Sequence, residues 1–428
     1  MNVLLIGSGG REHALALKIS QSRSLTKLFI YPGNPGTNQL GQNIEPTIND
    51  ENSLINFCHD NKIKLVVVGP EKPLIDGLAD KLILNGIKVF GPTKAAARLE
   101  GEKSFAKNLM KEYGIPTADY EVFTKDEYFD ALEYLKTSKP PVVIKADGIA
   151  AGKGVMIAAN FEEAKDALED CFVRSTFGAS GNKVVIEEFM TGQEASIFAI
   201  TDGIDYILLP AAQDHKRIGE GDTGKNTGGM GAYAPTPFVT DVILDQVALR
   251  IVEPTLKAMR DKFSMYSGCL YVGLMLTEDG PKVVEYNCRF GDPETQVVLP
   301  LLEGDFLELL YSVASGELKK RSVKYNGGAS VCVVAASKGY PDAYEKGKEI
   351  FGLEEITSDE MIIYHAGTAG KEGKIVTNGG RVLGATSIIN ENNLIKAKET
   401  AYKALSKIHF DGIYYRKDIS DKATKNLD

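Results

Sequence analysis

The residues of this sequence whose types and spacing could do chemistry gather most densely between Val283 and Gln296. Glu285 and Asn287 lie two residues apart on an expected strand, so their side chains face the same side. A carboxylate and an amide oxygen on one face suit a Mg²⁺ ion that keeps water ligands and shares phosphate oxygens. Arg289 continues this spacing and could bind a phosphoryl or carboxylate group through its forked guanidinium. A polar strand edge facing solvent is the plain alternative.

A second candidate site is a glycine-rich loop after the apolar strand expected at Val142–Lys145. Its backbone amides could lie on a triphosphate, and Lys145 could reach the α- and β-phosphates from the strand. The spacing is not that of a Walker A loop, because Gly154 stands where that motif has Ser or Thr. A lysine at a strand edge that reaches water is the structural alternative. The loop residues concerned are Gly148, Gly152, Lys153 and Gly154.

The expected strand Val184–Phe189 ends in two acids and is soon followed by a third. Backbone groups at this end could bind an adenine edge, and Glu194 could accept from ribose hydroxyls. Taken alone, Glu187 and Glu188 are more typical of a solvated strand end. Their position after the glycine-rich loop favours the nucleotide interpretation.

The amino-terminal glycines, Gly7-Ser8-Gly9-Gly10, follow a strand and precede a helix, where amides can bind phosphate. A dinucleotide fold is disfavoured, because Glu12 replaces the third glycine of its motif and the second strand ends in Tyr31-Pro32-Gly33, not in an acid. We expect a different phosphate-bearing substrate; a purely structural turn is the alternative.

The segment from Asp214 to Tyr233 is rich in glycine, charge and threonine. It is a poor core segment, so we interpret it as an active-site flap. His215 as a general base is one hypothesis for this segment, and a surface or substrate-positioning histidine is the other.

Secondary-structure patterns indicate how these residues are positioned. Apolar runs at Val3–Ile6, Leu28–Tyr31, Leu65–Val68 and Lys88–Phe90 predict a parallel sheet covered on both faces, with ligands at the carboxyl ends of its strands. Further on, the patterns predict helices over Lys103–Glu112, Val242–Met259 and Asn393–Ile408, a hairpin at Asn378-Gly379-Gly380, and a frayed tail after Asp418.

Composition bounds the class of protein. With 428 residues and 43% hydrophobic content, we expect three domains, and the net charge of −9 argues against nucleic-acid and lipid-surface binding. The five cysteines form no C-x-x-C pair, so reduced core thiols are expected and zinc is not. The start resembles no signal peptide, and no apolar run reaches about 18 residues, so a cytoplasmic protein is expected.

Together these features resemble the ATP-grasp superfamily: Lys103 in Glu-Gly-Glu-Lys, Lys145 with its glycine loop, the Glu187–Glu194 hinge, and Glu285, Asn287 and Arg289. Within it, the motifs at 7–14, 214–217, 228–233 and 289–296 resemble the phosphoribosylamine–glycine ligase family, from Met1 to about Asp418.

This resemblance implies an α/β fold with a parallel-sheet amino domain, an ATP-grasp core of two α+β lobes, and a small α/β carboxyl domain. We expect boundaries at 1–101, 102–325 (with the lobe 118–188 carrying the glycine loop) and 326–421. It also implies a monomer that uses ATP, glycine and phosphoribosylamine with Mg²⁺ or Mn²⁺, through a glycyl phosphate. The superfamily's second metal-binding acid has no counterpart at Tyr271–Leu276.

Site roles follow as hypotheses. Catalytic residues are Arg289, Asp214 and Lys216. ATP-binding residues are Lys103, Lys145, Gly148, Gly152, Lys153, Gly154, Glu187, Glu188, Phe189 and Glu194. Substrate-binding residues are Gly9, Gly10, Asn34, Pro35, Gly36, Gly228, Gly229, Arg289, Asp292 and Glu294. Metal ligands are Glu285 and Asn287.

Three other functions stay open. Another ATP-grasp enzyme, such as a biotin carboxylase or a purine-pathway carboxylase, should lack the octet at 289–296. A non-catalytic nucleotide sensor should have lost Glu285, Asn287 or Arg289. A dehydrogenase is the weakest alternative.

Overall fold

The computed structural model describes residues 1–44, 50–149 and 154–424 of the chain. The chain begins with a parallel sheet in the order β3-β2-β1-β4-β5. Its strands are β1 (Asn2–Gly7), β2 (Lys27–Pro32), β3 (Gln42–Asn43), β4 (Ile63–Val68) and β5 (Lys88–Phe90). The strand residues Val3–Leu5 and Leu65–Val67 are almost completely buried, as expected for strands covered on both faces. The predicted parallel sheet is therefore confirmed.

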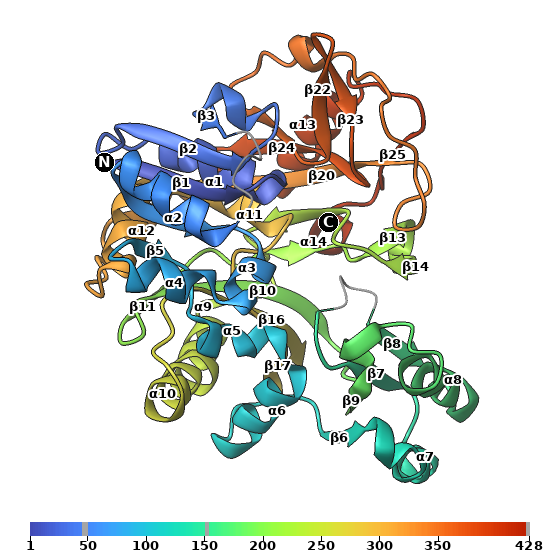
Figure 1. Cartoon of the computed structure of the whole chain (residues 1–428). Coiled ribbons are helices and arrows are strands. Elements are labelled where there is room, and N and C mark those ends of the chain that lie inside the picture. Colours follow the sequence, from blue (N-terminus) through green and yellow to red (C-terminus); the bar gives the residue numbers. More distant parts are fainter. Residues whose placement is uncertain (45–49, 150–153, 425–428) are drawn as a thin grey trace.

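Helices of this amino-terminal region are α1 (Gly10–Ser20), α2 (Glu51–Asp60), α3 (Glu71–Asp76), α4 (Leu78–Leu84) and α5 (Lys94–Gly101). The next helix, α6 (Lys103–Glu112), has the predicted bounds. Figure 1 shows this blue region beside the orange and red carboxyl-terminal elements, above the middle of the chain.

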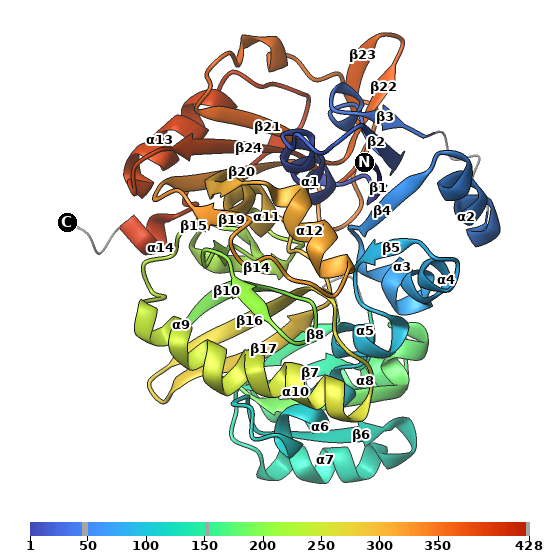
Figure 2. The same ribbon diagram turned by 90° about the vertical axis from the view of Figure 1, so that its left-hand side faces the viewer.

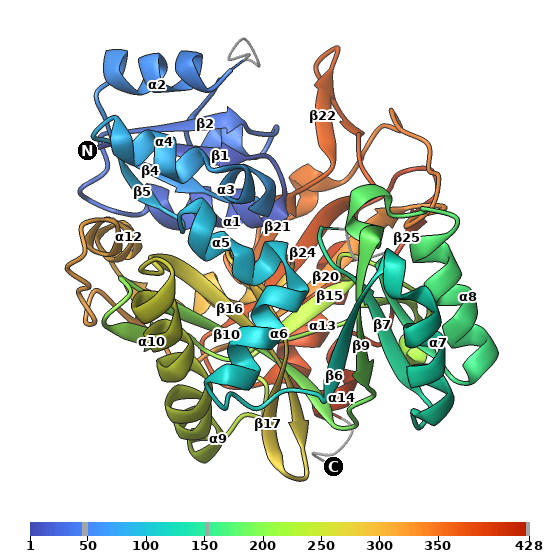
Figure 3. The ribbon, with the colours of Figure 1, turned by 60° about the horizontal axis from the view of Figure 1, so that its bottom comes forward.

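The middle of the chain forms two antiparallel sheets. One is β6-β9-β7-β8, from β6 (Tyr120–Thr124), β7 (Val142–Ala146), β8 (Val155–Ala158) and β9 (Lys183–Glu188). The helices α7 (Tyr128–Thr137) and α8 (Phe161–Phe172) share its apolar cluster. Figure 3 shows this lobe to the right of α6, to which it is bonded through Glu187 of β9 and Lys107 of α6. The other is β11-β10-β16-β17, from β10 (Gln193–Thr201), β11 (Tyr206–Leu208), β16 (Gly268–Thr277) and β17 (Gly280–Asn287).

The helix predicted over Val242–Met259 is present but not regular. It consists of α9 (Asp241–Val247), a π-helical segment at Ala248–Val252 and α10 (Glu253–Lys262), and crosses the front of the β16–β17 sheet in Figure 2. Pro254 lies at the start of α10 and lacks the amide that a regular turn would use, which accounts for a local change of hydrogen-bond pattern here.

A further sheet has the order β12-β15-β20-β24-β21, with β25 (Ile413–Tyr414) pairing to β20. Its strands are β12 (Gln213–Asp214), β15 (Gly231–Ala234), β20 (Ala329–Ser337), β21 (Met361–His365) and β24 (Arg381–Ile389), with α13 (Leu394–Leu405) packed on them. Because β12 and β15 join strands that follow residue 326, one sheet spans the predicted boundary there, and the division into domains stays a prediction.

Two sequence predictions for the carboxyl-terminal region are wrong. The hairpin there joins β22 (Thr368–Lys371) to β23 (Lys374–Thr377), and Asn378-Gly379-Gly380 instead carries the chain from β23 into the large sheet. The chain after Asp418 is not frayed up to Thr424, since Ile419 and Ser420 are fully buried and α14 (Asp421–Thr424) follows.

All five cysteines are buried and free, as predicted. Within the described parts of the chain, no helix is long and apolar enough to cross a membrane.

Candidate functional site

The pair predicted to bind metal lies at the end of β17. The register pairs Glu285 with Gly273 and Asn287 with Tyr271 on β16, which places both side chains on one face. Burial alone would raise the pKa of the Glu285 carboxyl, but the ammonium groups of Lys216, Lys145 and Lys103 lower it below its usual value. In the parts of the chain that the structure describes, no three His, Cys, Asp or Glu side chains form a metal cluster.

Arg289 lies beyond the end of β17, so its predicted place on the strand is wrong. Its Nε is 3.2 Å from Glu71 Oε2 and its Nη2 is 2.9 Å from Glu100 Oε1. Both acids come from the amino-terminal region, so the guanidinium joins the chain just after β17 to the helices α3 and α5. Sequence reasoning missed Glu71 and Glu100, because nothing local marks an acid whose partner is about two hundred residues away.

A buried ion cluster lies beneath the predicted phosphate site. Glu187 Oε2 is 2.9 Å from Lys145 Nζ on β7 and 3.1 Å from Lys107 Nζ on α6, and all three side chains are less than a tenth exposed. Burial lowers the pKa of Lys107 to about 8, although Glu187 opposes the shift. Glu187 therefore neutralises lysines here. Lys107 was missed, although its place one helical turn after Lys103 could have indicated it.

Lys103 lies at the rim of the same region. Its Nζ donates to the carbonyl of Gly148 at 2.7 Å. Gly148 has a φ of +147°, and a Cβ there would lie 2.5 Å from Ser180 Oγ, so only glycine fits. The carbonyl of Gly154 accepts from the Ala146 amide at 2.8 Å, which closes the loop against β7. Gly152 and Lys153 lie outside the described residues.

The predicted hinge after β9 has residues in two different environments, some at the surface and one beside Lys216. Glu188 is exposed, accepts from the Asp119 amide at 3.2 Å, and is followed by the half-exposed Phe189. Glu194, on β10, lies 3.2 Å from Lys216 Nζ. Glu194 thus belongs to the cluster around Lys216.

The Lys216 cluster joins the predicted catalytic residues. Lys216 Nζ lies 3.7 Å from Glu285 Oε1, as well as close to Glu194. Burial raises the pKa of the neighbouring Asp214 to about 8, with Lys216 opposing and Glu294 adding to the rise. Glu294 Oε1 accepts from the hydroxyls of Tyr271 and Ser196 at 2.9 and 3.2 Å. The structure therefore brings Asp214, Lys216 and Glu285 into one cluster, while Arg289 lies with Glu71 and Glu100. Their catalytic and metal-binding roles stay a prediction.

The predicted flap is largely held in place. The hairpin of β13 (Arg217–Gly219) and β14 (Thr223–Asn226) is bonded to Arg416, whose Nη1 donates to the Arg217 carbonyl and to Asp222 Oδ1. His215 is buried, not on the surface, because the Gly231 carbonyl and the Met230 amide bond to its backbone. Burial lowers the pKa of His215 to about 3, so its ring is neutral.

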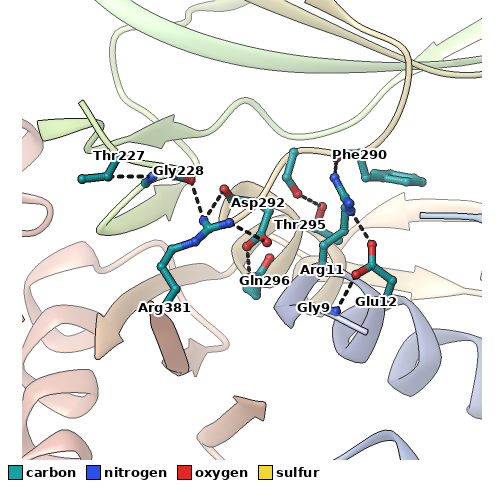
Figure 4. Close-up of polar contacts among 12 residues, drawn as sticks. Gly9, Arg11, Glu12, Thr227, Gly228, Phe290, Asp292, Thr295, Gln296 and Arg381 are labelled. Carbon is teal, nitrogen blue, oxygen red and sulfur yellow. Dashed lines mark hydrogen bonds and ion pairs between the residues drawn. The ribbon is translucent and has the colours of Figure 1, made fainter. Parts of the chain in front are cut away.

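The amino-terminal glycine turn contains an acid where a phosphate site was predicted. The Gly9 amide donates to Glu12 Oε2 at 2.7 Å, and Arg11 Nε lies 2.6 Å from Glu12 Oε1 (Figure 4). A Cβ on Gly10 would meet Gln296 Nε2 at 2.7 Å, so this glycine permits a close approach of α11 (Glu294–Val298). Arg11 and Glu12 were not predicted to be part of the site.

Asn34 shapes the turn after β2. Its amide nitrogen donates to the carbonyls of Ser8 and His365, and its oxygen accepts from the Gly36 and Thr37 amides. The side chain therefore fixes the Asn34–Gly36 turn against β21. Pro35 is half-buried within this turn.

Two of the remaining predicted substrate residues, Gly228 and Asp292, meet at the guanidinium of Arg381. Asp292 Oδ2 lies 2.9 Å from Arg381 Nη2, and the Gly228 carbonyl accepts from Nη1 (Figure 4). The Gly229 amide donates to Thr227 Oγ1 at 3.0 Å. Arg381 gave no signal in the sequence.

Comparison with known proteins gives one family along nearly the whole chain. The phosphoribosylglycinamide synthetase family matches as its N domain over residues 1–100, its ATP-grasp (A) domain over 101–295 and its C domain over 330–422. A phosphoribosylamine–glycine ligase of Caldanaerobacter subterraneus is 47% identical over 420 residues, which cover 98% of this chain and 99% of that protein.

Solved structures agree. The crystal structure of a phosphoribosylamine–glycine ligase from Thermotoga maritima has a TM-score of 0.84 and 37% identity, covering 98% of this chain and all of that one. A biotin carboxylase domain from Hydrogenobacter thermophilus, in complex with MgADP, has a TM-score of 0.73 at 16% identity, covering 97% of this chain and 91% of that one, which shows a shared fold alone. The predicted α/β architecture with an ATP-grasp core is confirmed.

Proposed function

The chain belongs to the phosphoribosylglycinamide synthetase family, and we propose that it joins glycine to 5-phosphoribosylamine at the expense of ATP, through a glycyl phosphate. It is an ATP-dependent carbon–nitrogen ligase of purine biosynthesis. The observation that carries the assignment of roles is that three lysines converge on one acid at the end of β17. The ammonium groups of Lys103, Lys145 and Lys216 together lower the pKa of the Glu285 carboxyl.

The first step transfers a phosphoryl group. A glycine carboxylate oxygen attacks the γ-phosphorus of ATP, the bond to the bridging oxygen breaks, and ADP leaves. Lys103, Lys145 and the loop residues Gly148, Gly152, Lys153 and Gly154 hold the phosphates in our proposal. Glu188, Phe189 and Glu194 are assigned to the adenosine part. Positioning and charge stabilisation account for such a step without an enzyme nucleophile.

The second step forms the amide. The ribosyl amine attacks the acyl carbon, inorganic phosphate leaves, and the nitrogen gives up a proton. We assign Asp214 to orient the amine, because an acid with a pKa of about 8 can exchange protons near neutral pH. In our proposal Lys216 and Arg289 stabilise the charge on the transferred group, and Gly228, Gly229, Asp292 and Glu294 lie around the substrates. We assign the ribose phosphate to the turns at Gly9–Gly10 and Asn34–Gly36, which requires the phosphate to displace Glu12 Oε2 from the Gly9 amide.

The family uses a divalent metal, and Glu285 and Asn287 fit one. They offer a carboxylate and an amide oxygen on one face, a donor set suited to Mg²⁺ that completes its shell with water and phosphate oxygens. When bound, the ion would neutralise charge on the phosphates. We propose Mg²⁺ or Mn²⁺ as the ion, a monomer, no nucleic-acid or membrane partner, and a cytoplasmic location, which the five free thiols support.

The test measures phosphate release from ATP by the purified protein. Phosphate release should require glycine and phosphoribosylamine together. An equal rate of release when either substrate is left out would contradict the proposal. Glu285→Gln should abolish turnover without changing the circular dichroism spectrum. The matched control, Glu278→Gln, alters an exposed acid at the β16–β17 turn and should keep wild-type turnover. Normal metal-dependent rates in Glu285→Gln would remove the assigned metal site.

A further inference from the structure

A single guanidinium ties two segments of the site to the carboxyl-terminal sheet. Arg381 is the first residue of β24, and its Nη1 donates to the carbonyls of Gly228 and Asp292, at 2.5 and 2.8 Å. Its Nη2 lies 2.9 Å from Asp292 Oδ2. Figure 4 shows the guanidinium between the Gly228 loop and the Asp292 turn. We call these three residues the Arg381 junction.

The contacts in the Arg381 junction are charge-assisted hydrogen bonds and a partly buried ion pair, which are stronger than neutral or exposed contacts. Both side chains of the ion pair are about one fifth exposed, so water screens them less than a surface pair. Burial would raise the pKa of Asp292, but Arg381 and then Arg11 lower it below its usual value, so the carboxylate is ionised. A planar fork reaches three acceptors on two segments, which one lysine ammonium cannot reproduce.

Each segment leads directly to a predicted catalytic group. On one side, the loop after Gly228 returns to His215, through the Met230 amide bonded to the His215 carbonyl at 2.8 Å. His215 lies between Asp214 and Lys216, so the position of the Gly228 loop bears on both. On the other side, Asp292 follows the end of β17 and Arg289.

The junction also touches the amino-terminal turn. Gln296 Nε2 donates to Asp292 Oδ1 at 2.7 Å and packs against the α-carbon of Gly10. By contrast, the lysines assigned to nucleotide phosphates are held elsewhere: Lys103 by the Gly148 carbonyl, and Lys145 by Glu187. The junction therefore belongs with the residues assigned to glycine and phosphoribosylamine, not with those assigned to the nucleotide.

We propose that Arg381 is a positioning residue for the two substrates other than ATP, holding the Asp214–Lys216 segment and the end of β17 in register for glycine and phosphoribosylamine. This inference rests on the proposed function. It predicts a selective effect: losing the guanidinium should lower the efficiency with which glycine and phosphoribosylamine are used, and should leave the binding of ATP nearly unchanged.

Steady-state kinetics of Arg381→Met and Arg381→Lys test the proposal. We expect kcat/KM for phosphoribosylamine and for glycine to fall about tenfold to a hundredfold, the size associated with losing hydrogen bonds to a charged group, with KM for ATP changed less than about twofold. Guanidinium ions at low millimolar concentration should partly restore Arg381→Ala. The matched control is Arg174→Met, which should behave as wild type. Arg174 is an exposed arginine just after α8, and its acid partners Asp166 and Asp170 lie on that helix.

Amide hydrogen exchange separates this inference from the proposed function, because it needs no turnover. Exchange should accelerate in 226–231 and 288–296 of Arg381→Met, and stay unchanged in 103–112 and 142–148. A uniform loss across all substrates with a lower melting temperature and no rescue would make Arg381 merely structural, and wild-type kinetics would equally overturn the proposal. An inactive wild-type protein would refute the proposed function, while the exchange pattern would still decide the inference.

Discussion

Substitution of Glu187 by glutamine is the sharpest perturbation that the site offers. Glu187 is the acid shared by Lys107 and Lys145, at 3.1 and 2.9 Å, with all three side chains nearly fully buried. The amide keeps the shape and removes the charge, which leaves two ammonium groups facing a neutral partner. Removing one member of a buried ion pair costs about 3–5 kcal/mol of unfolding free energy. That is a large share of the ~5–15 kcal/mol typical of native proteins.

The sign of the pH dependence gives a second criterion. The pKa of Lys107 is already lowered to about 8, against 10.5 for a free lysine. Between these two pH values the native state therefore binds protons more weakly than the unfolded chain. Stability from this group is therefore present at high pH and falls as the pH drops through that range. Without Glu187 the pKa falls further, so the penalty in Glu187→Gln should shrink between pH 7 and pH 9.

Urea unfolding followed by circular dichroism measures both effects, since the chain has no tryptophan for fluorescence. Glu188→Gln is the matched control: the neighbouring acid on β9 is exposed, and its loss should cost within about 0.5 kcal/mol. Lys107→Met combined with Glu187→Gln should recover part of the lost unfolding free energy, because the double variant removes one of the two unpaired ammonium groups together with the acid. Equal unfolding midpoints for Glu187→Gln and Glu188→Gln would refute the reasoning.

Three further predictions concern titration and the arginine fork. Burial lowers the pKa values of His13, His215 and His365 to about 3, 3 and 4, so stability should be full above pH 6.5 and fall below it, by up to ~1.4 kcal/mol per pH unit for each ring, as measured by urea unfolding at pH 7 and 5.5. Asp214, with its pKa raised to about 8, opposes this trend; in turnover, kcat/KM for phosphoribosylamine should rise with pH through about 8, and Asp214→Asn should abolish that rise. Arg289→Lys keeps the charge but not the fork, so kcat should fall more than about tenfold while circular dichroism stays unchanged.

Each of these has a clear contrary result. Stability that is flat between pH 7 and 5.5 would mean that the three rings take up protons in the folded state. A wild-type pH profile in Asp214→Asn would remove that carboxyl from the acceptor step. Unchanged kcat in Arg289→Lys would show that a single ammonium satisfies Glu71 and Glu100.

Local patterns predicted the parts of the fold that local physics decides. Apolar runs such as Leu65–Val67 can only be stable when covered on both faces, so the parallel sheet followed from them. The parity of Glu285 and Asn287 held because both lie on β17. The same parity failed for Arg289, because the strand ends at Asn287 and the chain then turns.

Long-range pairings were not accessible in the same way. The segment 214–233 is rich in glycine and charge, a composition that favours a flap. The partners that hold it come far later in the chain: the strand β20 about a hundred residues on, and Arg416 about two hundred. Tertiary contacts that composition does not encode hold it in place, such as those of Arg416 with the Arg217 carbonyl and with Asp222. His215 shows the same failure, since a histidine among charges is expected at the surface and is here nearly fully buried.

The cations of the site differ in how they are held before a substrate arrives. Lys145 shares an acid with Lys107, Lys216 lies near two acids, and Arg289 bonds to two more. Lys103 instead donates to the carbonyl of Gly148, and burial lowers its pKa, although Glu285 raises it. An ammonium bonded to a carbonyl can exchange that neutral acceptor for a phosphate oxygen without leaving an acid unpaired. A buried lysine that leaves its carboxylate incurs the cost of an uncompensated charge. Among the lysines of the site that the structure describes, we therefore expect Lys103 to be the one that moves onto the nucleotide, and Lys145 and Lys216 to act from fixed positions.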